Sequence, residues 1–180
     1  MWQLKLHKIS TWHVAYAVNM SVACLITYWI MVSLLPHVTG RPTPPVSVLW
    51  AVISAVFVYK NTRRRSLAAG LSRLFTTLVS VVICLAYLSF FPATSFGMAI
   101  LIAAGTMLMA SLGRFDEIGL TAITTAVIMI VATSDRQSAW AEPLLRLGDT
   151  VVGIVIGIVC KWLASFAFYK LSGQEVESQA

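Results

Sequence analysis

Residues 66–87 form a stretch, SLAAGLSRLFTTLVSVVICLAY, that is long and apolar enough to cross a lipid bilayer as one helix. It nevertheless carries Arg73 in its first turns. Because steps of three and four residues keep to one face of a helix, Arg73, Thr77 and Ser80 fall on one stripe. An arginine in an apolar helix is energetically costly, so it normally faces a protein interior, a water-filled cavity or the headgroup region.

A second stretch, residues 145–161, has the sequence LRLGDTVVGIVIGIVCK. Shifted by 73 positions it aligns with the first, and the alignment pairs Arg73 with Arg146. The matched pattern is R-L-x-x-T followed three positions later by a small residue. The two stretches therefore predict an internal duplication.

The composition indicates a membrane protein. Hydrophobic residues make up 58% of the chain and charged residues only 11%, whereas about a quarter of the residues in soluble domains are charged. The net charge of +6 would suit nucleic acid, but the basic residues cluster beside the apolar runs, as membrane orientation requires. We therefore expect the lipid bilayer, and no nucleic acid, as a partner.

Six apolar runs predict an all-α membrane protein with six transmembrane helices. The expected spans are residues 14–35, 45–60, 66–90, 95–112, 117–133 and 143–169. The six-helix domain then covers residues 14–170, between a cytoplasmic segment 1–13 and a polar cytoplasmic tail 171–180. The first run is too long for the core of a signal peptide and is expected to remain, ending near Pro36.

The basic residues predict the orientation of the spans. Lys60 and the run Arg63, Arg64 and Arg65 form the strongest basic cluster, so this loop is expected in the cytoplasm. With that choice, ten of the 13 lysines and arginines lie inside, leaving Arg41, Arg136 and Arg146 outside. The prediction is therefore that both termini are cytoplasmic (N-in/C-in).

Six spans divide as three plus three. Because three is odd, equivalent spans cross the membrane in opposite directions, which gives the 3+3 inverted repeat of many secondary transporters. Short spans in matching positions mark the binding site of such proteins, and we expect them at 45–60 and 117–133. Gly153 and Gly157 form a GxxxG pair that favours close helix packing.

The pattern resembles the fusaric acid resistance and aromatic acid exporter (FUSC-like) family of bacterial inner-membrane proteins. The similarity rests on the run LWAVISAVFV, the basic loop after it, and a family motif close to R-x-x-G-T-x-x-G at a helix start. Arg146, Asp149, Thr150 and Gly153 occupy the motif in the second half, with Asp149 replacing the first glycine. In the first half its positions are Arg73, Thr76, Thr77 and Ser80, with both glycines replaced.

The resemblance covers residues 14–169 and implies transport. It implies a multi-pass protein of the bacterial inner (plasma) membrane that exports small organic anions such as aromatic carboxylic acids. Full-length exporters of this family have two membrane blocks and a sizeable cytoplasmic region, whereas this chain has one block. We therefore expect a homo-oligomer, or an efflux partner protein, to complete the assembly.

The candidate substrate-binding residues are the two arginines with Thr77, Thr150 and Trp50. A guanidinium offers a carboxylate both a charge and a two-pronged donor. The alternative is that each arginine extends to its nearest membrane interface or caps a helix, and that Trp50 only packs. Asp149 either carries protons in a coupled exporter or simply pairs with Arg146, three residues before it.

Other classes of function are not supported by the sequence. The cysteines are scattered in apolar runs without metal-ligand spacing, and neither a nucleophile triad nor a phosphate loop is visible. We therefore expect no enzyme, no catalytic residue, no metal and no cofactor. Two alternatives to an exporter remain, namely a passive anion channel and a non-transporting subunit of a larger efflux assembly.

Overall fold

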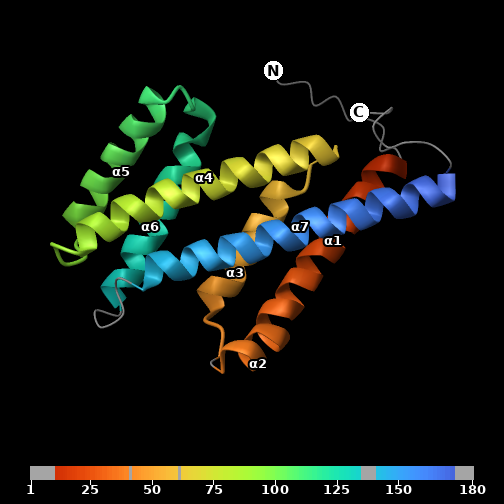
Figure 1. Ribbon diagram of the computed structural model, residues 1–180, viewed down its shortest axis with the longest axis horizontal. Coiled ribbons are helices and arrows are strands. Elements are labelled where there is room, and N and C mark those ends of the chain that lie inside the picture. Colours follow the sequence, from red (N-terminus) through yellow and green to blue (C-terminus); the bar gives the residue numbers. More distant parts are fainter. Residues whose placement is uncertain (1–10, 41, 61, 135–140, 173–180) are drawn as a thin grey trace, which may run out of the picture.

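The computed structural model describes residues 11–40, 42–60, 62–134 and 141–172, and every regular element in these ranges is helical (Figure 1). The all-α prediction is confirmed for this part of the chain. Most of the predicted terminal segments, at 1–10 and 173–180, lies outside the described residues, as do Arg41 and Arg136.

The first helical run changes its winding before it ends. Helix α1 (Thr11–Trp29) continues through a π-helical segment, Ile30–Leu34, into the short helix α2 (Leu35–Thr39). The run does not end at Pro36 as expected. Pro36 lies in the first turn of α2, where the N–H that proline lacks is not required.

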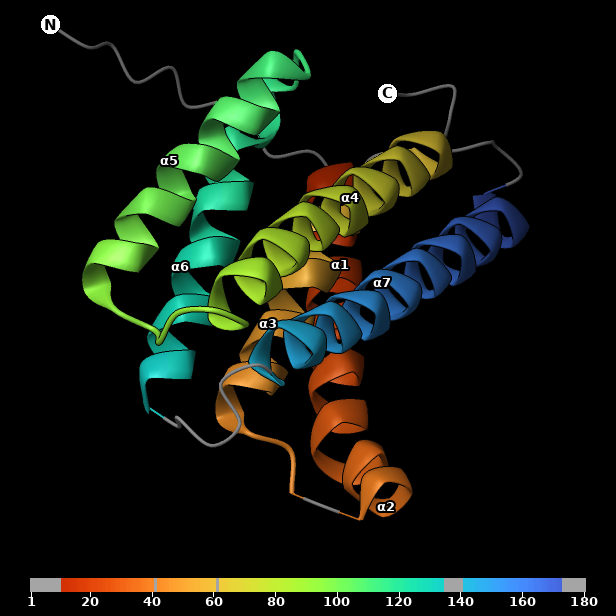
Figure 2. The ribbon, with the colours of Figure 1, turned by 60° about the vertical axis from the view of Figure 1, so that its left-hand side comes forward.

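Two long helices form the centre of the bundle. Helices α4 (Arg63–Leu88) and α7 (Glu142–Ser172) lie side by side and run antiparallel (Figures 1 and 2). Helix α3 (Pro45–Val58) packs on α7, and α6 (Ile118–Ser134) packs on α4. Helix α1 adds to α3, and α5 (Ser95–Ser111) adds to α6. Each central helix is thus flanked by two others: α3 and α1 lie beside α7, and α6 and α5 lie beside α4.

Four helices in the described ranges are long and apolar enough to cross a membrane. They extend over Val14–His37, Arg63–Leu88, Phe115–Thr133 and Glu142–Phe166. Helices α3 and α5 are apolar but shorter, with 14 and 17 residues. The span predicted at 117–133 corresponds to α6, which has 17 residues, and the 3-10 turn at Phe115–Glu117 before it brings the helical run to 19 residues.

The distribution of side chains is the reverse of that in a soluble protein. Large apolar side chains face outward on several helices, as Leu71, Met107 and Leu163 do with exposed fractions of 68%, 75% and 63%. Serines, threonines and two arginines are buried instead. Such a surface fits a lipid environment, and the buried polar groups indicate where a functional site lies.

Candidate functional site

A stripe of residues on α3 lies between the two central helices. Ser47, Trp50, Ser54 and Phe57 are three or four residues apart, so they share one face of the helix. The first three are buried, and α3 contacts both α4 and α7. This face therefore meets the arginines of both halves of the chain.

Arg73 of α4 contacts the α3 stripe with an exposed fraction of only 1%. Its Nε donates a hydrogen bond to Oγ of Ser54 over 3.4 Å. Its Cζ lies 5.1 Å from the centroid of the Trp50 ring and 4.8 Å from that of Phe57. Within the described ranges no carboxylate pairs with Arg73, and its buried Nη2 has no hydrogen-bond partner. The charge of Arg73 is therefore left without a counter-charge.

A cavity of about 570 Å³ reaches Arg73 from the end of the bundle where α4 begins. Its polar lining includes Lys60, Ser72, Arg73, Arg114 and Glu117. Glu117 forms an ion pair with Arg114 over 2.6 Å and accepts a hydrogen bond from Ser72. The cavity is in the size range of small-molecule sites, and its charged lining consists of three cations, Lys60, Arg73 and Arg114, and two acids, Asp116 and Glu117.

Arg146 of α7 is equally buried but differently partnered. Its Nη2 donates to Oγ of Ser47 over 2.9 Å and lies 3.5 Å from Oε2 of Glu142. Its Nη1 forms an ion pair with Oδ2 of Asp149 over 3.1 Å. Both acids are on the same helix, one turn before and one turn after the arginine. Arg146 is therefore held by anions that the chain itself supplies.

Trp50 connects the two arginine sites. The face of its ring meets Arg73, while its Nε1 donates a hydrogen bond to Oγ1 of Thr150 over 3.1 Å. Thr150 in turn donates to the backbone carbonyl of Arg146 over 2.8 Å. Four of the residues selected from the sequence thus form one continuous chain of contacts between α4, α3 and α7.

The fifth predicted binding residue, Thr77, lies one turn beyond Arg73 and is fully buried. Its hydroxyl has no hydrogen-bond partner among the described residues, and the same holds for Thr125 on α6. Ser80 of α4 donates to the carbonyl of Thr121 over 3.2 Å. Buried hydroxyls without partners suit a region that receives water or a polar ligand.

Gly153 and Gly157 bring α7 against α3. A Cβ added to Gly153 would overlap the backbone of Ala51 and lie 2.7 Å from Cβ of Ser54. One added to Gly157 would lie 3.0 Å from the carbonyl oxygen of Ala55. Without side chains at these two positions, the helices approach closely enough for Trp50 to reach Thr150.

Several residues of the site were not selected from the sequence. They are Ser47, Ser54, Phe57 and Glu142, which contact the two arginines. The spacing of Ser47, Trp50 and Ser54 is the same three-and-four pattern that marked Arg73, so it was a usable signal. Glu142 lies just before the span predicted at 143–169, whereas in the structure it begins α7 one turn before Arg146.

The fold and site together define a helical membrane protein with a buried cationic centre. The family described as fusaric acid resistance protein-like matches residues 22–160, and the chain belongs to that family. The family consists of membrane transport and resistance proteins rather than enzymes, so the chain is a multi-pass membrane protein of this general kind. Neither the curated proteins nor the solved structures include a significant match.

Proposed function

We propose that this protein is a six-span exporter of the bacterial inner membrane that moves small organic anions, such as aromatic carboxylic acids, and has both termini in the cytoplasm. Membership of the family supports transport in general. Helices α3 and α5 are too short to count as spans by length, yet they are apolar and lie alongside the four longer ones. The protein acts as an oligomer or with an efflux partner.

The packing pattern supports an inverted repeat within the proposed exporter. In such a repeat α1, α3 and α4 correspond to α5, α6 and α7. The contact of α3 with α7 then corresponds to that of α6 with α4, and the contact of α1 with α3 to that of α5 with α6. The antiparallel pair α4 and α7 lies at the centre, as expected for elements beside a two-fold axis within the membrane plane.

The observation that carries the proposal is the state of Arg73. A buried guanidinium without a carboxylate partner is energetically unfavourable and attracts an anion. The rings of Trp50 and Phe57 beside it offer surfaces on which an aromatic acid can stack. The adjacent cavity gives such an acid a route to Arg73 from the end of the bundle that carries the basic cluster.

Asp149 is the proposed site of proton coupling. While ionised it pairs with Arg146 and occupies the position that a transported carboxylate would take. Protonation removes the negative charge, so the ion pair weakens and Arg146 becomes available to the substrate. The proton and the substrate anion then compete for the same ion pair. This competition allows the protein to exchange one for the other.

Flux of labelled benzoate through the purified protein in sealed vesicles tests this function. Above the accumulation in protein-free vesicles, which benzoic acid enters by diffusion, the wild-type protein is expected to accumulate benzoate only under an imposed pH gradient, and Arg73→Gln is expected to abolish this excess. Arg64→Gln is the matched control, because Arg64 is an exposed cation on the first turn of the same helix. Equal flux in Arg73→Gln and wild type contradicts the role of Arg73.

The same assay separates the two alternatives from an exporter. A passive channel would equilibrate benzoate at the same rate with and without the pH gradient. A non-transporting subunit would show no flux alone and would gain it only with its partner. Either result would contradict the proposed exporter and support the corresponding alternative.

A further inference from the structure

Lys161 is a buried cation that the proposed transport does not use. It lies on α7 with an exposed fraction of 3%, about 22 Å along the helix from Arg146 at 1.5 Å per residue. Its Nζ is 5.3 Å from the centroid of the Tyr59 ring and 5.9 Å from that of Tyr16. Across the described ranges no acid forms an ion pair with it.

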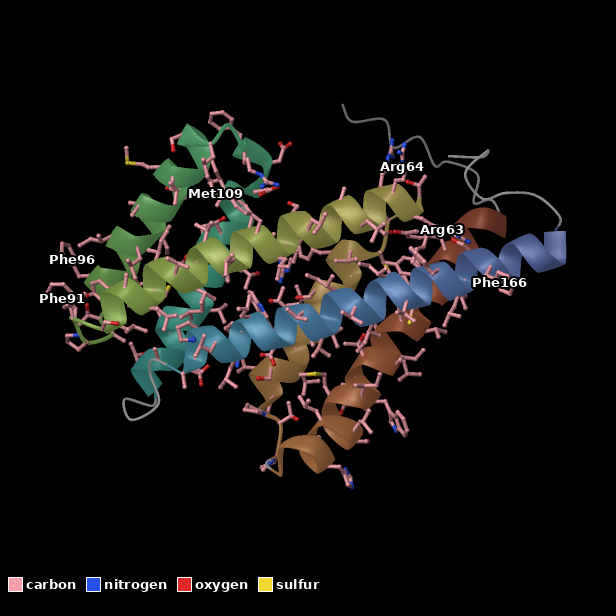
Figure 3. The ribbon with its side chains drawn as sticks, viewed as in Figure 1. Arg63, Arg64, Phe91, Phe96, Met109 and Phe166 are labelled. Carbon is pink, nitrogen blue, oxygen red and sulfur yellow. The ribbon has the colours of Figure 1, made fainter. Side chains whose placement is uncertain are left out.

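A second cation reaches the same place from another helix. Arg63 begins α4, and its Cζ lies 5.9 Å from the ring of Trp162, the residue that follows Lys161. Arg63 thus contacts the residue next to Lys161, and among the described residues no acid forms an ion pair with either cation. Figure 3 shows Arg63 between the start of α4 and α7, with Phe166 farther along α7. Two like charges that converge without an acid create a site for a shared anion.

The surroundings of this pair are those of a membrane interface. Tyr16 donates a hydrogen bond to the carbonyl of Tyr59 over 2.7 Å, and the two rings meet edge to face with their centroids 5.3 Å apart. Trp162 follows Lys161 on α7. Aromatic residues are concentrated at headgroup level in membrane proteins. Beside them Trp162, Leu163 and Phe166 expose 48%, 63% and 62% of their surface, which suits an acyl chain.

We propose that the junction of α1, α4 and α7 binds the headgroup phosphate of an anionic phospholipid, with Lys161 and Arg63 as its ligands. The phosphate supplies the counter-charge that both cations lack among the described residues. The exposed apolar surface along α7 favours a lipid over free phosphate, because only a lipid brings acyl chains to cover it. This site is independent of the proposed anion transport.

Native mass spectrometry with phosphatidylglycerol and phosphatidylcholine as probes tests the site. The wild-type protein is expected to prefer phosphatidylglycerol, and both Arg63→Gln and Lys161→Gln are expected to lower that preference about fivefold, or ~1 kcal/mol for each basic residue. Lys161→Arg keeps the charge and should keep most of the preference. Arg64→Gln, which removes an exposed neighbouring cation, should leave it unchanged.

Three outcomes would overturn the proposal. The first is an equal loss in Arg64→Gln and Arg63→Gln, which would indicate a diffuse surface charge effect. The second is displacement of phosphatidylglycerol by millimolar inorganic phosphate, which would indicate a site for free phosphate. The third is unchanged preference in Arg63→Gln, an exposed replacement that is expected to fold even if Lys161→Gln does not.

Discussion

The surroundings of Arg73 and Arg146 differ although the two residues occupy equivalent motif positions and are equally buried. Arg146 is paired with Glu142 and Asp149 and bonded to Ser47. Arg73 has one long hydrogen bond, two aromatic rings and an adjacent cavity. One copy of the motif is therefore neutralised by acids of its own helix, whereas the arginine of the other copy has no carboxylate partner among the described residues.

The difference teaches that burial alone does not tell an arginine that is paired with acids from one that has no acidic partner. A buried ion pair is destabilised strongly when one partner is removed, because the remaining charge is left unpaired. A buried cation without a carboxylate is itself a source of strain, and its removal relieves that strain. Replacing each arginine in turn therefore distinguishes the two situations.

The largest effect is expected at Arg146. Arg146→Gln leaves the carboxylates of Glu142 and Asp149 buried and unpaired, so the free energy of unfolding should fall by about 3–5 kcal/mol. Arg73→Gln should be neutral or stabilising. Denaturant titration in mixed detergent micelles measures both, and the triple variant E142Q/R146Q/D149N should recover most of the loss. Equal losses at the two arginines would remove the distinction between them.

The next largest effect concerns the binding of benzoate, which tests the difference between Arg73 and Arg146 directly. Benzoate should stabilise the wild-type protein by about 2.7 kcal/mol at one hundred times its dissociation constant. Arg73→Gln should abolish this stabilisation, since it removes the unpaired guanidinium. Asp149→Asn should preserve it, because the cavity beside Arg73 does not include Asp149. Thermal melting at increasing benzoate measures the shift, and a wild-type shift that persists in Arg73→Gln would contradict the assignment of the open site.

The small residue at the fourth motif position, Gly153 or Ser80, differs between the halves as well. Gly153→Ala should destabilise the protein by about 1–3 kcal/mol, because the new methyl group would overlap the backbone of Ala51. Ser80→Ala, the equivalent change in the first half, should cost only about 1 kcal/mol, for one lost hydrogen bond. Gly148→Ala is the control, since a Cβ there meets nothing within 4 Å. Thermal unfolding should show the largest loss of stability in Gly153→Ala, a smaller loss in Ser80→Ala and the smallest in Gly148→Ala. Similar losses in Gly148→Ala and Gly153→Ala would show that close packing is not the cause.

Part of this arrangement could be predicted from the sequence. Helical periodicity identified the polar face of α4, because a buried stripe must repeat every three or four residues. The pairing of Arg146 with Asp149 follows from their separation of three residues on one helix. The contrast between the two arginines could not be predicted in this way. It depends on which side chains of α3 face each arginine, and helix packing decides that.

Helix lengths were predicted less well because the limits of an apolar run are not the limits of a helix. Proline in the first turn of α2 leaves the helical run intact, although proline usually suggests an end. The 3-10 turn Phe115–Glu117 extends the helical run that contains α6 to two residues before the predicted start at 117. Both cases are local backbone choices that hydrophobicity does not determine.

The smallest predicted effect concerns the bridge between the two sites. Trp50→Phe keeps an aromatic face for Arg73 but removes the Nε1–H that donates to Thr150, so it should cost about 1 kcal/mol of stability. Thr150→Val removes the acceptor of the same bond, together with the bond from Thr150 to the Arg146 carbonyl. In a double-mutant cycle the two changes should therefore combine to less than the sum of their separate effects. Denaturant titration of the four proteins measures this coupling, and strict additivity would show that Trp50 does not link the open arginine site to the neutralised one.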